Sequence, residues 1–214
     1  MNFEGINIER LGHDTFKVTN GKVLYFDPHV LPKGPQKADI ILVSHDHFDH
    51  CDPDKIKEIS KADTVIVTSK SSSKKLKGNI KIIKPGERLA LDGGIQVEAV
   101  YAYNINKFRS PGVPFHPRSD DFLGFVVTFD GKRIYHAGDS DNIPELKGLK
   151  DIDIALLPVS GTYVMTVQEA IDAARIIKPR LAIPMHYGVI VGEEKDARAF
   201  KEGLKDSSIR VEII

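Results

Sequence analysis

Residues 40–50 read IILVSHDHFDH, in which four apolar residues lead into a string with three histidines and two aspartates. A run of β-branched residues and leucine bounded by polar residues predicts a buried strand. The metal-binding side chains would follow the carboxyl end of this strand, where α/β sheets usually place their chemistry. No other part of the chain is so dense in groups that bind metals.

The spacing within this string indicates two metal ions. Residues two apart on an extended chain point to the same side, so His45 and His47 can share one ion. Asp49 and His50 follow the turn at Phe48 and are expected to face a second ion. Imidazoles and carboxylates packed this closely destabilise one another unless a cation lies among them.

Composition narrows the class of protein. A chain of 214 residues with no compositional break suits one domain over residues 1–214, and its 30 basic and 30 acidic residues leave no net charge. There is one cysteine, no stretch of 18 apolar residues and no signal pattern. We expect a soluble cytoplasmic protein with a small-molecule substrate and neither nucleic acid nor membrane as partner. A homo-oligomer stays open.

The order of predicted elements indicates a duplicated fold. Short strands over residues 6–11, 16–18 and 23–26 form an antiparallel meander, in which Asn20-Gly21 predicts a type I′ hairpin turn. Strand and helix elements follow, and the same succession occurs again in the second half. A final strand is expected over residues 211–214.

Three helices are marked by their ends. Asp52-Pro53 predicts an N-cap and a first helical residue, and residues 166–169 form a capping box before an apolar helical spacing that ends near Ile177. Residues 193–204 predict an amphipathic helix. Residues 104–121 show no period, and loops this long in compact domains are usually functional or disordered.

Histidines or aspartates follow predicted strands, or lie in loops between strands, at four separate places: residues 45–50, His116, Asp139 and His186. A site of imidazoles and carboxylates for two divalent ions suits zinc, iron or manganese. Calcium and magnesium prefer oxygen ligands throughout.

With these motifs the chain resembles the metallo-β-lactamase superfamily, and most closely its small single-domain metal-dependent hydrolases related to ascorbate-6-phosphate lactonase. The resemblance rests on the His-x-His-x-Asp-His string, Leu11-Gly12-His13, Asp27-Pro28, Tyr135-His136-Ala137-Gly138-Asp139 and Pro184-Met185-His186-Tyr187-Gly188. It implies an α+β fold, a four-layer αββα sandwich of two similar halves, which agrees with the duplication.

The resemblance also implies the ligands and the chemistry. It assigns His45, His47 and His116 to the first ion, Asp49, His50 and His186 to the second, and Asp139 as a bridge between them. Two divalent ions, zinc above all with manganese or iron as alternatives, would stabilise a shared hydroxide for hydrolysis of a small ester, lactone or phosphoester. Asp49 would orient this hydroxide and pass a proton to the leaving group.

Three residues near these motifs receive weaker roles. His13 is expected near the metal pocket, in contact with a ligand or the substrate. Tyr187 can donate to a developing oxyanion or simply pack, and His136 is expected to orient a ligand. The redox flavo-diiron type has a glutamate where this chain has His47, which favours a hydrolase. Cys51 is read as incidental.

Cationic side chains leave two further alternatives. Lys107, Arg109 and Arg118 near His116 can form an anion pocket or a solvated loop. A basic segment with Lys70, Lys74, Lys75 and Lys77 suggests a ribonuclease or phosphodiesterase acting on nucleic acid, but it lacks interleaved aromatic residues. A metal-binding protein without turnover is the third reading.

Overall fold

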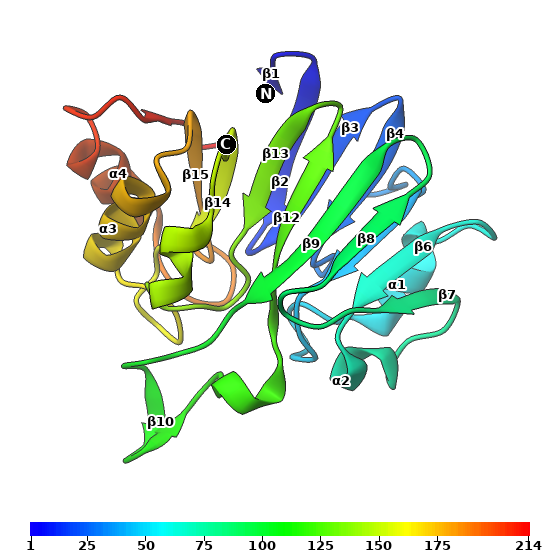
Figure 1. Cartoon of the computed structure of the whole chain (residues 1–214), viewed down its shortest axis with the longest axis horizontal. Coiled ribbons are helices and arrows are strands. Elements are labelled where there is room, and N and C mark those ends of the chain that lie inside the picture. Colours follow the sequence, from blue (N-terminus) through cyan, green and yellow to red (C-terminus); the bar gives the residue numbers. More distant parts are fainter.

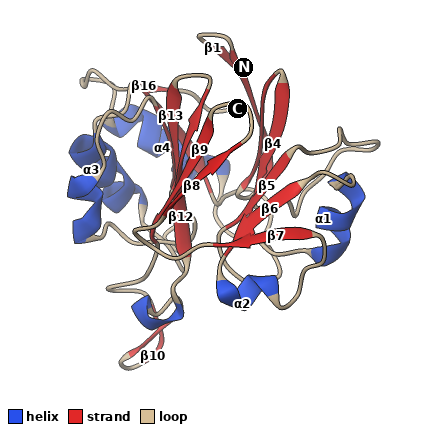
Figure 2. Ribbon diagram, turned by 45° about the vertical axis from the view of Figure 1, so that its right-hand side comes forward, coloured by secondary structure: helices blue, strands red, loops and turns tan.

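Two mixed sheets pack face to face in the computed structural model, which describes residues 1–214, and helices cover both outer faces (Figures 1 and 2). The first sheet contains, in spatial order, β1 (Asn2–Phe3), β2 (Ile6–Gly12), β3 (Thr15–Asn20), β4 (Lys22–Phe26), β5 (Ile40–Val43), β6 (Val65–Thr68) and β7 (Asn79–Ile82). The second contains β16 (Arg210–Val211), β15 (Leu181–Met185), β14 (Ile154–Pro158), β13 (Lys132–His136), β12 (Leu123–Phe129), β9 (Ile95–Tyr101) and β8 (Arg88–Leu91). The predicted αββα sandwich is confirmed.

Each sheet has an antiparallel half and a parallel half. Neighbouring strands from β1 to β4 are antiparallel, whereas β4, β5, β6 and β7 run parallel. In the second sheet β8, β9, β12 and β13 are antiparallel, and β13, β14, β15 and β16 run parallel. The duplication predicted from the element order is therefore present in the topology.

The core lies mainly between the sheets. Fully buried aromatic residues of the first sheet, such as Phe16 and Phe26, belong to one apolar cluster with Phe125 and Phe129 of the second. Truncation of such a phenylalanine to alanine typically costs about 3–5 kcal/mol. This interface fixes the distance between the two sheets, and hence between the site residues that each sheet supplies.

The helices begin where the sequence marks them. Helix α1 (Pro53–Ile59) starts after Asp52, whose carboxylate accepts hydrogen bonds from two backbone amides of the first turn. Helix α3 (Val167–Ile177) has the predicted capping box, and α4 (Glu194–Gly203) matches the amphipathic segment. A one-turn helix, α2 (Lys70–Ser73), lies in the basic segment. None of the helices has both the length and the apolar character needed to cross a membrane.

Three local predictions are corrected. The hairpin after β3 forms, but only Gly21 has a positive φ, of 67°, and Thr19 pairs with Val23, so the turn is not type I′. The last strand covers Arg210–Val211 only, and the backbone bonding to β15 ends with the hydrogen bond from the Glu212 amide to the Ala182 carbonyl oxygen. The loop over residues 104–121 contains structure of its own, namely β10 (Phe108–Ser110), β11 (Val113–Pro114) and the 3-10 helix η1 (Arg118–Asp120). A second 3-10 helix, η2 (Pro144–Gly148), precedes β14.

Candidate metal centre

Five segments meet at one edge of the sandwich, beyond the carboxyl ends of parallel strands. The string at residues 45–50 follows β5, Asp139 follows β13 and His186 follows β15. The turn between β2 and β3 supplies His13, and the long loop supplies His116. Residues more than 170 positions apart in the sequence therefore lie side by side, since the backbone amide of His186 donates to the carbonyl oxygen of His13 over 3.3 Å.

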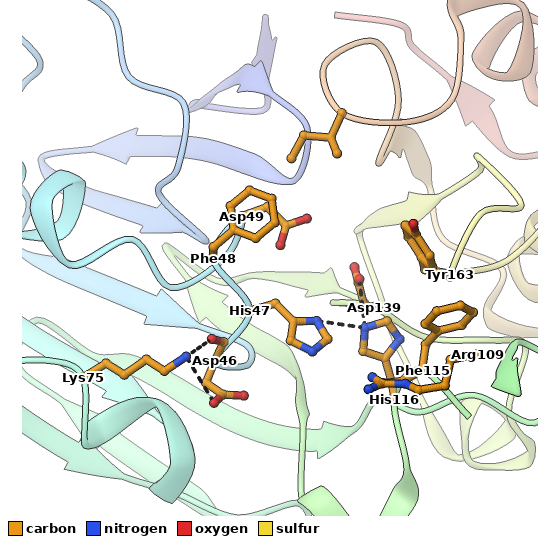
Figure 3. A pocket seen from close by; sticks show the side chains of 11 residues that line it. Asp46, His47, Phe48, Asp49, Lys75, Arg109, Phe115, His116, Asp139 and Tyr163 are labelled. Carbon is orange, nitrogen blue, oxygen red and sulfur yellow. Dashed lines mark hydrogen bonds and ion pairs between the residues drawn. The ribbon is translucent and has the colours of Figure 1, made fainter. Parts of the chain in front are cut away.

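The first ligand group consists of His45, His47, His116 and Asp139. Nδ1 of His47 lies 3.0 Å from Nε2 of His45 and 3.3 Å from Nε2 of His116, and Figure 3 shows the latter pair turned toward one another beside Asp139. Nε2 of His116 is 3.2 Å from Oδ2 of Asp139. Ligand atoms about 2.0–2.1 Å from a tetrahedral zinc ion are separated by roughly 3.3 Å, so this spacing suits one ion.

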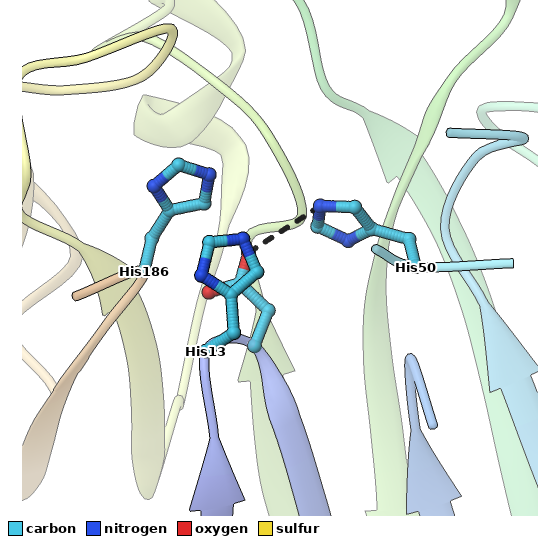
Figure 4. Close-up of side chains that lie close together, drawn as sticks. His13, His50 and His186 are labelled. Carbon is cyan, nitrogen blue, oxygen red and sulfur yellow. Dashed lines mark ion pairs between the residues drawn. The ribbon is translucent and has the colours of Figure 1, made fainter. Parts of the chain in front are cut away.

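The second group consists of His13, Asp14, His50 and His186, whose ligand atoms all lie within 4.8 Å of one another. Figure 4 shows the three imidazoles gathered around a common point. Oδ1 of Asp139 is 3.3 Å from Nε2 of His50 and 3.5 Å from Nε2 of His186. Oδ2 of Asp139 thus faces the first group and Oδ1 faces the second, which is the arrangement expected of a bridging ligand.

Asp49 lies at the pocket side of the second group. Its Oδ2 is 3.1 Å from Nε2 of His13 and 3.8 Å from Nε2 of His50. The sequence reading placed Asp49 with His50 and His186 around one ion. The structure groups His50 and His186 with His13 and Asp14, and Asp49 lies beside this group rather than within it. His13, expected only near the pocket, is inside the group.

Four of the histidines have a hydrogen-bond partner on Nδ1, which leaves Nε2 directed at the centre. The pairs are His45 with Ser44 at 2.9 Å, His50 with Asp27 at 2.8 Å, His116 with Asn104 at 2.9 Å and His186 with Ser160 at 2.9 Å. Partners of this kind fix the ring orientation of metal-binding histidines. The arrangement therefore holds imidazoles ready for ligation.

Several buried polar atoms at the centre have no hydrogen-bond partner. They are Nδ1 of His13, both carboxylate oxygens of Asp14, Nε2 of His50, Oδ1 of Asp139 and Nε2 of His186. Each unsatisfied buried polar atom typically costs about 1–3 kcal/mol. Basic nitrogens and carboxylate oxygens that converge in this way fit divalent cations, which would satisfy both kinds of atom together.

The charges at the second group reinforce one another. Burial acts to raise the pKa of Asp139, but the imidazoles of His50 and His186 outweigh it and hold that pKa well below 3.8. Burial acts to lower the pKa of His50, yet Asp139 and Asp27 raise it well above 6.5. The pKa of His186 is raised in the same way by Asp139. Protons on these imidazoles occupy positions that a cation would take.

In the first group the pKa values of two imidazoles are lowered rather than raised. Burial, with His50 next, lowers the pKa of His45 well below 6.5, and burial and His116 lower that of His47. These imidazoles are therefore neutral at pH 7, as metal binding requires.

Burial acts to raise the pKa of Asp49, but the hydrogen bond from His13 brings it down to about 2, so this carboxylate is ionised.

The backbone around the centre is held in unusual conformations. His13, Asp27 and His186 have φ values of 49°, 42° and 60°, in the left-handed region that non-glycine residues seldom adopt. Such conformations cluster at functional sites, where the surrounding structure enforces them. Gly138, with φ of 59°, precedes Asp139, and a Cβ there would lie 2.6 Å from the carbonyl oxygen of Leu123.

A pocket of about 610 Å³ opens onto Asp49, His116 and Asp139. Its wall combines apolar side chains with two cations, and Figure 3 shows most of them. The other lining residues are Asp46, His47, Phe48, Lys75, Arg109, Phe115, Tyr163 and Ile190.

Of the three cations considered for an anion pocket, only Arg109 lines this space. Nζ of Lys107 lies 2.8 Å from Oε2 of Glu169, and Arg118 stacks on Tyr101 and pairs with a glutamate at the surface. Lys75, from the basic segment, also lines the pocket but pairs with Asp46.

The structure places the remaining candidates, Tyr187, His136 and Cys51, in three different surroundings. The Tyr187 ring does not line the pocket; it is buried beneath the guanidinium of Arg10, at 3.8 Å. Nε2 of His136 lies 3.0 Å from the carbonyl oxygen of Asp14, so His136 positions the turn that carries Asp14. Cys51 is buried, and burial raises the pKa of its thiol to about 12.

Sequence reasoning missed Asp14 and the partners of the histidines. Asp14 had a visible signal, since it directly follows His13 at the end of a strand. Ser44 directly precedes the metal-binding string. Asn104 and Ser160 had no local signal, because they reach His116 and His186 from 12 and 26 positions away.

Known proteins resemble this chain over nearly its whole length. A family model described as a beta-lactamase superfamily domain matches residues 7–186. The chain is 34% identical to a UPF0173 metal-dependent hydrolase of Methanoculleus marisnigri, covering 95% of this chain and 91% of that protein. It is 35% identical to a UPF0173 metal-dependent hydrolase of Thermoplasma acidophilum, with 92% and 90% covered.

A solved structure agrees with these matches. A protein of Parabacteroides distasonis, described as a candidate metal-dependent hydrolase, has a TM-score of 0.84 at 40% identity and covers 97% of this chain and 92% of that one. The matched family model, the relatives and the shared fold together show that the chain belongs to the metallo-β-lactamase superfamily.

Proposed function

We propose that the protein is a binuclear metal-dependent hydrolase that cleaves a small ester, lactone or phosphoester. The observation that carries this proposal is the position of Asp139, whose two carboxylate oxygens face two separate groups of buried ligands. Metal-dependent hydrolysis is also the activity for which its relatives are named. Zinc suits the first group best, since three imidazoles and one carboxylate favour it.

Two divalent ions held by these residues would supply a nucleophile at neutral pH, because such ions lower the pKa of bound water to about 7. The chain's own residues supply the rest. Asp49 lines the pocket as an ionised carboxylate, and His13 holds it through a 3.1 Å contact. Asp49 is therefore placed to orient the attacking group and to pass a proton to the leaving group.

The pocket supports a small substrate with an apolar part and an anionic group. Phe48, Tyr163 and Ile190 line the pocket, and each is exposed to solvent over 40% or more of its surface. Apolar side chains of this kind suit the apolar part of a ligand. The guanidinium of Arg109 at the same wall suits a carboxylate or phosphate. A small-molecule substrate, rather than nucleic acid or a membrane, is the partner we propose.

The test is metal-dependent turnover on nitrophenyl esters, lactones and phosphodiesters, together with the metal content of each preparation. We expect two ions per chain and hydrolysis that a chelator abolishes. Asp139→Asn should lower the metal content and abolish hydrolysis while the circular dichroism spectrum is unchanged. Asp153→Asn is the matched control, because Asp153 accepts from the Arg133 amide at the opposite end of the parallel strands.

Three outcomes would contradict the proposal. A wild-type protein with two ions that hydrolyses no member of the panel would favour a metal-binding protein without turnover. An Asp139→Asn protein with full metal content and normal rate would remove Asp139 from the centre. Turnover confined to RNA, with binding that weakens steeply with salt, would instead favour a nuclease.

A further inference from the structure

Asp14 is a buried carboxylate without any hydrogen-bond partner. Its side chain has no solvent exposure, and neither Oδ1 nor Oδ2 contacts a donor. Other buried aspartates of the chain are satisfied: Asp27 accepts from the amide and hydroxyl of Ser44, and Asp141 accepts from two backbone amides. Buried carboxylates are normally paired with a positive charge or bound to a metal ion, so the burial of Asp14 indicates a cation beside it.

The surroundings of Asp14 place that cation. Oδ2 of Asp14 is 3.7 Å from Nε2 of His50, and its ligand atom lies within 4.8 Å of those of His13 and His186. Nε2 of His50 and Nε2 of His186 also lack hydrogen-bond partners and lie near Oδ1 of Asp139. The orphaned nitrogens of His50 and His186 thus lie close to orphaned carboxylate oxygens of both Asp14 and Asp139.

The turn that carries Asp14 is held in place from the opposite sheet. The carbonyl oxygen of Asp14 lies 3.0 Å from Nε2 of His136, and the ring of His136 stacks on Phe26 at 4.9 Å. The preceding residue, His13, has a φ of 49°. This fixed turn directs the Asp14 side chain into the second group.

We propose that Asp14 is a direct ligand of the second metal ion and reaches it from the buried side of the centre. The inference rests on the proposed two-metal function and names a ligand for it. Asp14 then joins His13, His50 and His186, with Oδ1 of Asp139 beside them, at the second ion. Asp49, which lines the pocket and contacts His13, faces the substrate side.

This shell differs from that of the first ion. The second group has its own carboxylate, Asp14, beside the shared Asp139, whereas the first has only Asp139 beside its three imidazoles. Carboxylate ligands suit harder ions such as manganese better than imidazoles do. The second site should therefore accept manganese more readily than the first.

The experiment measures metal per chain in the full-length wild type, Asp14→Asn and Asp14→Ala after equilibration with zinc or manganese. We expect two ions in the wild type and one in both variants, with affinity for the second ion lowered at least about tenfold. The shift of the melting temperature on adding metal should shrink in parallel. Asp153→Asn is the control, since Asp153 accepts from the Arg133 amide at the opposite end of the parallel strands.

A measurement on the unmutated chain covers the case in which the variants do not fold. Anomalous scattering from crystals of the metal-loaded wild type should place an Asp14 oxygen roughly 2.0–2.2 Å from the second ion. A separation beyond about 3 Å, or two tightly bound ions in Asp14→Asn, would overturn this proposal alone. A wild type that binds only one ion would overturn the two-metal function as well.

Discussion

Nδ1 of His50 lies 2.8 Å from Oδ2 of Asp27, and this contact directs the Nε2 atom of His50 toward Asp139. Asp27 itself is buried and is anchored by the amide and hydroxyl of Ser44. The ligand string therefore folds back on a carboxylate from the end of β4. The orientation of His50 depends on a residue outside the string.

Removal of this support should weaken the second metal site. We expect Asp27→Asn to lower the affinity for the second ion by about 10–100-fold, since loss of a partner of a metal-binding histidine typically has that effect. Asp39→Asn is the matched control, because Asp39 also accepts a backbone amide, that of Val23 at 2.7 Å, but lies away from the centre. Metal titration with a competing chelator measures both. Equal losses in the two variants would show that Asp27 acts only on stability.

The two sites should respond differently to pH. His50 and His186 have raised pKa values, so a proton must leave each imidazole before it binds metal, and affinity at the second site should fall as pH is lowered. His45 and His47 have lowered pKa values and are already neutral, so the first site should change little near pH 7. Calorimetric titration in buffers of different ionisation enthalpy counts the protons released. Equal proton release for both ions would contradict the assignment.

Gly138 should tolerate no side chain. Gly138→Ala combines a left-handed backbone, which costs about 1–2 kcal/mol, with a Cβ placed 2.6 Å from the Leu123 carbonyl oxygen, which adds about 1–3 kcal/mol. Gly131→Ala has a similar φ of 72° with nothing within 4 Å of the new Cβ, so it should show only the first cost. Denaturant unfolding of the metal-free variants measures the difference. Equal free energies of unfolding would show that the chain shifts to accommodate the methyl group.

Substitutions of Arg109 and Lys107 should have different effects on the KM for an anionic substrate. Arg109→Ala should raise KM for an anionic substrate about fivefold with little change in kcat, since an exposed ion pair contributes up to about 1 kcal/mol. Lys107→Ala should leave KM nearly unchanged, because Lys107 pairs with Glu169 outside the pocket. Steady-state kinetics with matched charged and neutral esters measures both. A KM that rises only in Lys107→Ala would overturn this division.

Local sequence signals determined the elements and much of the ligand inventory. The apolar run before the string forms β5 because its four residues are buried on both faces of the sheet. Asp52 and Thr166 mark helix starts, since a side-chain oxygen can satisfy amides only a few residues away. Capping interactions of this range involve residues that are close in the sequence, so they could be predicted without knowledge of the fold.

Tertiary structure decided which distant residues join the two ligand groups and which support them. The sequence put Asp49 with the second ion. Asp14 directly follows His13 in the sequence, but it joins His50 only when the β2–β3 turn packs against the carboxyl ends of the parallel strands. The partners of His116 and His186 likewise come from other loops. Side chains at a metal centre interact across a few ångströms of space. Which residues share that space is set by the packing of the two sheets, and no spacing along the chain encodes it.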